Sequence, residues 1–400
     1  MKILHVAYIY PPKLGVADGI TTVAYNVTRE LAKRGHEVAV FTSDMLDLHN
    51  NSSLQPSHSV VNGVDVYYLK SIFRSKTFTA TPSLISLFSE NTRKYDVIHI
   101  HDCRSFQGIV AYVFAKLKKV PYVYQPHGSF VSTLPESTGL KFARITIDSL
   151  IGRKIVMGAS TVIAISQAEA FAYRDFGVPE ERIKIVPNGI DTSKYFNLPC
   201  EGGFKEHFKI AKDKKVVLYL GRIHSTKGLS FLIRAYAYLT NQLNYVDSVL
   251  VIAGPDDGFL SNAKRLANKL GIMESVLFTG SLSEKEKIQA YVDSDVVVNV
   301  EPRNAFGLVI IEAAACQKPV IVSEGNAISE VVHAGRFGFS VKYGRVGELA
   351  ELLDKMLSDD ASMRSMGGLG RDFIFDNYGW DSVVDRLEKA YDEIAQQTKS

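Results

Sequence analysis

The segment from Leu218 to Gly228 carries two cations at a spacing that suits a diphosphate. An aliphatic, strand-like run delivers Arg222 into a loop, and Lys227 follows five residues later, just before a helix-like segment. A guanidinium offers bidentate contacts and an ammonium offers a point charge, which together can clamp a diphosphate. The alternative is a solvated loop with two ordinary charges.

A single carboxylate, Glu312, interrupts the otherwise apolar, helix-like stretch 308–315. A carboxylate in such surroundings is costly unless it is hydrogen-bonded. Two adjacent hydroxyls, such as those of a ribose, would satisfy it. The alternative is a glutamate that caps a neighbouring loop in the core.

Histidines end two of the strand-like runs. His99 and His101 alternate at the end of Val97–His101, and His127, followed by Gly128, comes after the run Tyr122–Gln125. Neutral imidazole can hydrogen-bond a hydroxyl or a carbonyl group. Because a histidine at a strand end is usually structural, we interpret His99 and His101 as structural. A metal site would need a third ligand, which the sequence does not specify.

Two further segments have weaker signals. The loop 11–19 joins the first strand to a helix, where backbone N–H groups can bind a phosphate; a plain β–α turn is the alternative. It lacks the dinucleotide pattern G-x-G-x-x-G, which weakens an NAD interpretation. The triplet 293–295, Asp-Ser-Asp, resembles a metal-binding motif but stands at a helix-to-strand junction without acidic neighbours. We therefore interpret it as a turn and expect no metal.

Short β-branched runs alternate with helical segments along the chain. The first series of expected strands is Ile3–Tyr10, Glu37–Thr42, Val64–Leu69, Val97–His101, Tyr122–Gln125, Thr161–Ile165 and Lys184–Val186. The second series is Val216–Leu220, Val249–Ala253, Val276–Phe278, Val296–Val300, Val320–Val322 and Phe339–Val341. Helices are expected at Ile20–Arg34 and Asp381–Gln396. This pattern predicts two parallel-sheet, Rossmann-like domains joined near residues 190–215, with ligands beyond the carboxyl ends of the strands.

Composition limits the class of protein. The chain has 400 residues, 46% hydrophobic and 22% charged, which predicts two or three globular domains. Its apolar runs are far below the roughly 18–20 residues of a membrane-spanning helix, and the N-terminus lacks a signal-peptide pattern. Three scattered cysteines, Cys103, Cys200 and Cys316, lack metal-site spacing. We therefore expect a soluble, intracellular protein without disulfides.

Positive charge gathers in the first half of the chain. Residues 1–190 hold 21 Lys and Arg against 15 Asp and Glu. This mild excess suits a partner with phosphates, such as a nucleotide, an anionic lipid surface or a charged glycan. It is too weak to indicate binding to nucleic acid, and no aromatic–basic interleaving is present.

In their order and spacing, these motifs resemble the retaining glycosyltransferases of family four, which have the GT-B fold. The resemblance extends over most of the chain. His127-Gly128 is similar to the family's His-Gly motif, and Arg222 with Lys227 is similar to its diphosphate clamp. Phe306-Gly307 and Glu312 resemble the second half of its Glu-x7-Glu motif.

This resemblance implies two Rossmann-like domains facing across a cleft. Residues 1–193 would form the acceptor-side domain, joined by a returning helix at about 378–400, and residues 194–377 would bind the nucleotide-sugar. The implied activity is retaining transfer of a hexosyl or N-acetylhexosaminyl group from a nucleotide-diphosphate donor, with UDP-sugar favoured over GDP-sugar. The acceptor would be a hydroxyl of a glycan, a lipid-linked sugar or a small molecule. No metal or other cofactor is implied.

The resemblance also assigns roles to residues. Arg222 and Lys227 would stabilise the leaving diphosphate, and His127 would approach the donor sugar near the reacting carbon. Glu312 would hold the ribose hydroxyls. The other implied donor-binding positions are Gly19, Asn304, Phe306, Gly307, Leu308, Asn326, Ala327 and Ile328.

Two positions depart from the family pattern. Asp18 stands where the family has the first of two glycines, and Asn304 replaces the first Glu of the Glu-x7-Glu motif. An amide can still bind a hydroxyl or an acetamido group, and Glu301 offers a compensating carboxylate. The alternatives are a catalytically weakened nucleotide-sugar-binding protein and another GT-B enzyme such as an epimerase.

Two stretches of the first domain, 71–95 and 140–157, mix basic and apolar residues. Such stretches can lie on anionic membranes, and the alternative is a core-facing helix with a solvated basic face. The membrane interpretation predicts a cytoplasmic protein in peripheral contact with the inner face of the membrane. It would make lipid-linked sugars plausible acceptors.

Overall fold

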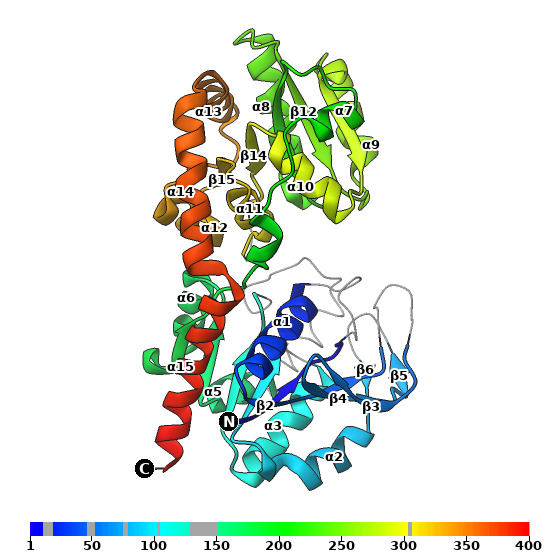
Figure 1. The fold of residues 1–400 in the computed structure, drawn as a ribbon, viewed down its shortest axis with the longest axis vertical. Coiled ribbons are helices and arrows are strands. Elements are labelled where there is room, and N and C mark those ends of the chain that lie inside the picture. Colours follow the sequence, from blue (N-terminus) through cyan, green and yellow to red (C-terminus); the bar gives the residue numbers. More distant parts are fainter. Residues whose placement is uncertain are drawn as a thin grey trace. The chain divides into compact units, whose positions relative to one another are not determined.

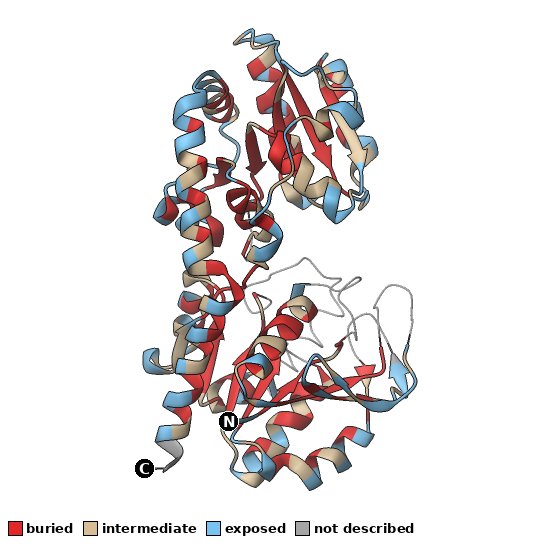
Figure 2. Ribbon diagram, viewed as in Figure 1, coloured by how far each residue is buried: buried red, intermediate tan, exposed pale blue. Residues whose placement is uncertain are grey.

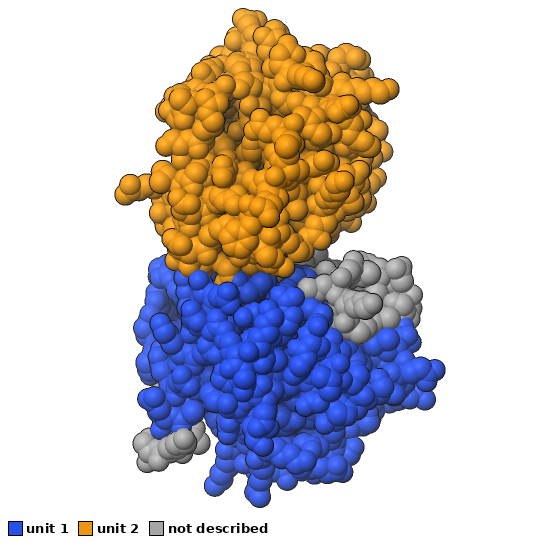
Figure 3. All heavy atoms as spheres, viewed as in Figure 1, with its two compact units in different colours: residues 1–189, 380–400 blue, residues 190–379 orange. Residues whose placement is uncertain are grey.

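The computed structural model describes residues 1–10, 19–45, 53–74, 79–101, 105–128, 151–302 and 306–399 (Figure 1). The chain divides into two compact units, coloured separately in Figure 3. Unit 1 comprises Met1–Gly189 and Trp380–Ser400, and unit 2 comprises Ile190–Gly379. Residues 190–193 and 378–379, which the sequence analysis assigned to the first domain, thus belong to unit 2.

Unit 1 is built on an eight-stranded sheet with the order β10-β9-β8-β7-β1-β2-β4-β3. All neighbours pair in parallel except β3 and β4. The strands are β1 (Lys2–Val6), β2 (Glu37–Ser43), β3 (Ser57–Val61), β4 (Val64–Leu69), β7 (Val97–His101), β8 (Tyr122–Gln125), β9 (Thr161–Ala164) and β10 (Ile183–Ile185). The described helices are α1 (Gly19–Lys33), α2 (Ser83–Asn91), α3 (Phe106–Lys118), α5 (Arg153–Gly158), α6 (Gln167–Phe176) and α15 (Trp380–Lys399).

The sequence analysis missed the antiparallel edge of this sheet. Strand β3 pairs with β4 through a two-residue turn, Asn62-Gly63, whose φ angles are 51° and 82°. Asn-Gly is a strong signal for this type of hairpin turn, so β3 was predictable. A second missed hairpin joins β5 (Phe73–Arg74) to β6 (Thr79–Ala80). Strand β1 ends at Val6, four residues before the end expected from the sequence.

Unit 2 is built on a six-stranded, fully parallel sheet with the order β13-β12-β11-β14-β15-β16. Its strands are β11 (Lys215–Leu220), β12 (Ser248–Ala253), β13 (Val276–Gly280), β14 (Val296–Asn299), β15 (Val320–Ser323) and β16 (Gly338–Val341). Its helices are α7 (Gly203–His207), α8 (Leu229–Asn241), α9 (Leu260–Lys269), α10 (Glu284–Asp293), α11 (Leu308–Ala315), α12 (Ala327–Gly335), α13 (Val346–Ser358) and α14 (Asp360–Tyr378). The central strands β11, β12, β14 and β15 are buried along most of their length (Figure 2), as expected for a sheet covered by helices on both faces, and the edge strands β13 and β16 are mostly half-buried.

The last helix, α15, returns to unit 1, as predicted. Its apolar face, which includes Trp380, Leu387 and Tyr391, joins the unit 1 core. On the polar side, Arg34 at the end of α1 forms ion pairs with Asp385 and Glu388 at 2.6 Å each. The helix is therefore an integral part of unit 1.

The described parts of the two basic stretches are divided between core and surface. Leu84 and Phe88 of α2 are fully buried, which fits the core-facing interpretation for this helix. Ile72, Phe73 and Ile85 are exposed. Residues 129–150 lie outside the described residues. None of the described helices is long and apolar enough to cross a membrane, and the described cysteines, Cys200 and Cys316, are free thiols.

Candidate functional site

Arg222 and Lys227 both follow the carboxyl end of β11, and each is paired with a carboxylate. The Arg222 side chain is 62% exposed and its Nη1 lies 2.5 Å from Oδ2 of Asp257. Lys227 is half-buried, and its Nζ lies 2.7 and 2.8 Å from the two carboxylate oxygens of Glu301, which follows β14. Because β11 and β14 are neighbours in the sheet, this ion pair ties two adjacent strand ends together.

Gly228 allows this close approach. Its φ is +74°, and a Cβ built there would lie only 2.3 Å from the carbonyl oxygen of Val300. Only glycine accepts both the left-handed backbone and the contact. Helix α8 begins at the next residue, so Gly228 fixes both the start of the helix and the position of Lys227 beside Glu301.

Asn326 links the same strand end to helix α12. Its side-chain oxygen accepts a hydrogen bond from the N–H of Ser329 at 3.1 Å, as an N-cap residue does. Its amide donates to the backbone carbonyl of Glu301 at 3.1 Å. The first helical residues, Ala327 and Ile328, therefore begin next to the Lys227–Glu301 pair, and the first N–H groups of a helix attract anions.

Glu312 lies on α11, and its carboxylate is satisfied by α10. Oε1 pairs with Nζ of Lys287 and Oε2 accepts a hydrogen bond from the hydroxyl of Tyr291, both at 2.9 Å. These contacts offset the cost of partial burial, and among the described residues both partners of the carboxylate are side chains of α10 and not a loop. Helix α11 begins at Leu308, directly after Gly307, which has φ +83°, and the buried Phe306.

In unit 1, His127 and Gly128 form a strained turn after β8, with φ angles of 54° and 83°. Glu169 of α6 holds this turn. One of its carboxylate oxygens accepts a hydrogen bond from the N–H of Gly128 and the other from the N–H of Ile165, both at 2.9 Å. Burial raises the pKa of Glu169 to about 7 despite these two donors.

His127 also contacts a group of buried histidines. Its Nε2 lies 2.9 Å from Nδ1 of His101, whose Nε2 lies 2.7 Å from Nδ1 of His5. His5, His99 and His101 place ring nitrogens within 4.8 Å of one another. The sequence analysis identified His99 and His101 but missed His5, because the pairing of β1 with β7 is not visible in the sequence.

Three predicted positions remain to be placed. Gly19 opens α1, and a Cβ there would meet nothing within 4 Å, so packing does not require glycine at this position. Asp18 and Asn304 lie outside the described residues.

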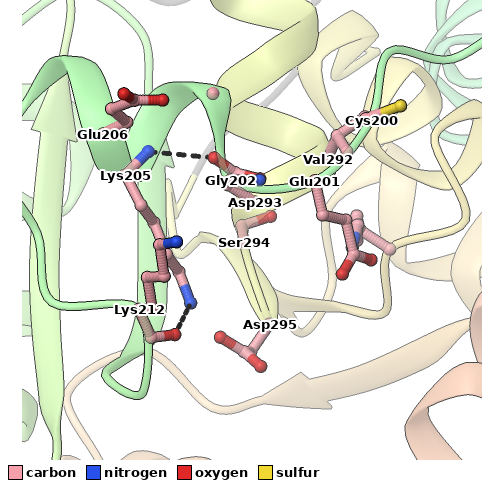
Figure 4. A pocket seen from close by; sticks show the side chains of 12 residues that line it. Cys200, Glu201, Gly202, Lys205, Glu206, Lys212, Val292, Asp293, Ser294 and Asp295 are labelled. Atoms are coloured by element: carbon pink, nitrogen blue, oxygen red, sulfur yellow. Dashed lines mark hydrogen bonds between the residues drawn. The ribbon is translucent and has the colours of Figure 1, made fainter.

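A pocket of about 510 Å³ lies elsewhere in unit 2 and is lined by the 293–295 triplet (Figure 4). Asp293 accepts hydrogen bonds from the N–H groups of Gly202, Phe204 and Lys205 at 2.6–2.9 Å. Asp295 accepts one from the N–H of Val216 at 2.7 Å and pairs with Lys215. Both carboxylates thus anchor backbone, which agrees with the interpretation of the triplet as a turn.

Comparison with known proteins identifies two family matches that follow each other along the chain. "Glycosyltransferase Family 4" matches residues 17–194, and "Glycosyl transferases group 1" matches residues 204–392. An uncharacterized glycosyltransferase of Methanocaldococcus jannaschii is 27% identical, over 98% of both chains. The D-inositol 3-phosphate glycosyltransferase of Corynebacterium jeikeium is 26% identical, over 98% of this chain and 95% of its own. The structure of Anabaena HepE in complex with UDP and glucose is similar with a TM-score of 0.72 and 19% identity, over 98% of this chain and 100% of HepE.

We predict that Gly228→Ala strongly destabilises unit 2, because the added methyl group would collide with the Val300 carbonyl. Gly271→Ala is the matched control, since Gly271 has φ +71° but open space around its Cβ position. The control should lose about 1–2 kcal/mol from left-handed strain alone, and Gly228→Ala at least twice as much. Urea unfolding measures both. Equal losses of stability in the two variants would show that the close approach to the Val300 carbonyl does not matter.

We predict that Glu169 makes stability pH-dependent. Its pKa is about 7 in the folded chain against 4.5 for the ordinary group, so the folded state holds the proton more tightly. The stability of the wild type relative to Glu169→Gln should therefore fall as pH rises from about 4.5 to 7, by up to about 3 kcal/mol. Urea unfolding across this range measures the difference, and a pH-independent difference would contradict the prediction.

Proposed function

The chain is a GT-B glycosyltransferase that belongs to the glycosyl transferases group 1, and we propose that it moves a hexosyl or N-acetylhexosaminyl group from a UDP-sugar to an acceptor hydroxyl with retention at the anomeric carbon. The observation that carries the proposal is the pair of cations, Arg222 and Lys227, at the carboxyl ends of the unit 2 strands. The UDP named in the HepE structure supports this base over guanine.

The two cations have the charge that the leaving group requires. In the proposed step, the bond between the anomeric carbon and the diphosphate oxygen breaks, and the oxygen keeps the electron pair. The acceptor oxygen bonds to the same face of that carbon, and its proton passes to the leaving phosphate. Arg222 and Lys227 stabilise the negative charge that develops on the diphosphate. Because protein cations supply this charge, we propose that no metal is needed.

The remaining predicted residues would bind the ribose, the phosphates and the sugar of the donor. Glu312 keeps lone pairs beyond those used by Lys287 and Tyr291, so it can accept hydrogen bonds from ribose hydroxyls. The N–H groups at Ala327 and Ile328, together with the backbone at Gly19, would contact the phosphates. His127 would approach the donor sugar.

The acceptor is proposed to bind unit 1. The positive charge of residues 1–190 favours an acceptor with an anionic group. The names of two relatives point to anionic small molecules: inositol 3-phosphate in the enzyme of C. jeikeium, and L-malate in the N-acetyl-alpha-D-glucosaminyl L-malate synthase of Bacillus anthracis. A glycan or a lipid-linked sugar at the inner face of the membrane is the other acceptor class, and exposed Ile72 and Phe73 would suit contact with lipid.

A second candidate function is nucleotide-sugar binding with weakened turnover. It is favoured by Asn304, which replaces a carboxylate that contacts the donor sugar in the family. Another GT-B reaction, such as epimerisation, is less well supported, because Arg222, Lys227 and Glu312 match the spacing of the transferases.

We predict that UDP binds at micromolar concentration without added metal, more tightly than GDP or ADP, in isothermal titration calorimetry. Lys227→Met and Arg222→Ala should weaken binding at least tenfold, since each removes a charge-assisted contact to the diphosphate. Lys269→Met is the control, because it removes an exposed cation of the same unit. Failure of every nucleotide to bind folded protein would contradict the proposal.

We predict that Glu301→Gln strengthens the binding of UDP and of its sugar conjugate by the same factor, about threefold. Its carboxylate neutralises Lys227 and repels an incoming phosphate. Glu324→Gln, which removes an exposed charge from the same unit, is the control. If the variant bound only the sugar conjugate more weakly, and not UDP, Glu301 would instead contact the donor sugar in place of Asn304. Unchanged binding and transfer would contradict both roles.

A further inference from the structure

Helices α10 and α11 are joined by a cluster of three polar side chains. Lys287 and Tyr291 are four residues apart on α10, so they lie on the same face of that helix. Both contact the carboxylate of Glu312 on α11. Nζ of Lys287 lies 2.9 Å from Oε1, and the hydroxyl of Tyr291 donates to Oε2 at 2.9 Å. Each carboxylate oxygen therefore has its own partner.

This cluster lies towards the edge of the sheet where ligands are expected. Helix α10 follows β13 and α11 follows β14, so both helices begin at the carboxyl edge and run back along the sheet. Lys287 is in the first turn of α10, and Glu312 is little more than one turn into α11. Parallel α/β sheets bind their ligands beyond this edge.

The Glu312 side chain is partly accessible on a helix that is otherwise buried. Its neighbours Ile311 and Ala313 are fully buried, whereas the Glu312 side chain keeps 17% of its surface exposed. The Lys287 side chain keeps 23%, and Tyr291 is fully buried. The carboxylate side chain is thus held by α10 and still reaches the surface.

Helix α10 is itself fixed at both ends. At its N-terminus, Ser283 and Glu286 form a capping box. At its C-terminus, Asp293 accepts hydrogen bonds from three backbone N–H groups of the segment 202–205. The two side chains between these anchors therefore project from a well-held helix, and such side chains orient a neighbour more precisely than side chains on a loop.

Both partners of Glu312 are hydrogen-bond donors. A lysine ammonium has donors and no acceptor. Burial, together with the nearby carboxylate, raises the pKa of Tyr291 well above its ordinary value, so its hydroxyl keeps the proton that it donates. The carboxylate of Glu312 is therefore left as an acceptor for any further group.

The two contacts use half of the hydrogen-bonding capacity of this carboxylate. Its two oxygens have about four lone-pair sites, and among the described residues one donor occupies a site on each oxygen. One site on each oxygen remains. Two neighbouring hydroxyls, such as the 2′- and 3′-hydroxyls of a ribose, can donate to both oxygens at once, and a single hydroxyl cannot.

We propose that Lys287 and Tyr291 are positioning residues that hold the carboxylate of Glu312 ready to accept both ribose hydroxyls, and that they thereby make the site selective for ribonucleotides over deoxyribonucleotides. This role rests on the proposed function, in which Glu312 binds the ribose of the donor. Without the two contacts from α10, the ligand itself would have to order a flexible glutamate side chain, at a cost in affinity.

Isothermal titration calorimetry with UDP, 2′-deoxy-UDP and 3′-deoxy-UDP tests this role. The measured quantity is the ratio of the dissociation constant of each deoxynucleotide to that of UDP. We expect both ratios to be about ten or more in the wild type, because each analogue lacks one hydrogen bond to a charged group. Lys287→Met and Tyr291→Phe should each lower both ratios about threefold or more.

These ratios separate positioning from a general loss of stability or of charge, which affects all three nucleotides alike. Lys285→Met is the matched control, because it removes an exposed cation from the same helix, and it should leave both ratios unchanged. Glu312→Ala should bring both ratios to about one. Tyr291→Phe removes one hydroxyl and keeps the buried ring, so it decides the question if Lys287→Met does not fold.

The possible failures can be told apart. Unchanged ratios in Lys287→Met and Tyr291→Phe, with ratios near one in Glu312→Ala, would overturn the positioning role and leave the ribose contact in place. Ratios near one in the wild type would overturn the ribose contact and the selectivity, while UDP binding would still support the proposed function. A folded wild type that binds no UDP would contradict the proposed function and the positioning role with it.

Discussion

The ion pair between Lys227 and Glu301 is the contact on which the organisation of unit 2 around its candidate site depends. It holds a half-buried cation between the carboxyl ends of two neighbouring parallel strands. Gly228 brings the loop close enough for the pair to form, and Asn326 ties helix α12 to the backbone of Glu301. A cation kept in place by a carboxylate is ready for an anionic ligand, because little side-chain entropy remains to be lost on binding.

Unit 1 also holds its candidate residue in place, but through other contacts. Its candidate residue, His127, sits at positive φ, a conformation that persists only where the surroundings enforce it. Glu169 fixes the backbone of the turn through the N–H of Gly128, and His101 fixes the ring. Backbone and side chain are thus held from two directions, by a helix and by the core of the sheet.

Much of the fold follows from sequence, and the contacts at the site do not. The alternation of β-branched runs and helical stretches predicted both parallel sheets, and the family resemblance implied that the last helix returns to the first domain. The strand β3 was missed although Asn62-Gly63 signals its turn. His5 and Glu169 were missed for a physical reason: their partners come from strands and helices far away in the chain. Glu301 was noticed, but its pairing with Lys227 depends on the order of strands in the sheet.

The release of UDP from UDP-sugars by the purified protein tests the central claim most directly, because it separates an enzyme from a nucleotide-sugar-binding protein. Each donor would be incubated with and without a crude acceptor extract, and UDP followed by ³¹P nuclear magnetic resonance, alongside Lys227→Met. We expect acceptor-dependent release from one donor, reduced at least a hundredfold in the variant, with or without a chelator. Tight binding of UDP without cleavage of any donor would contradict the account.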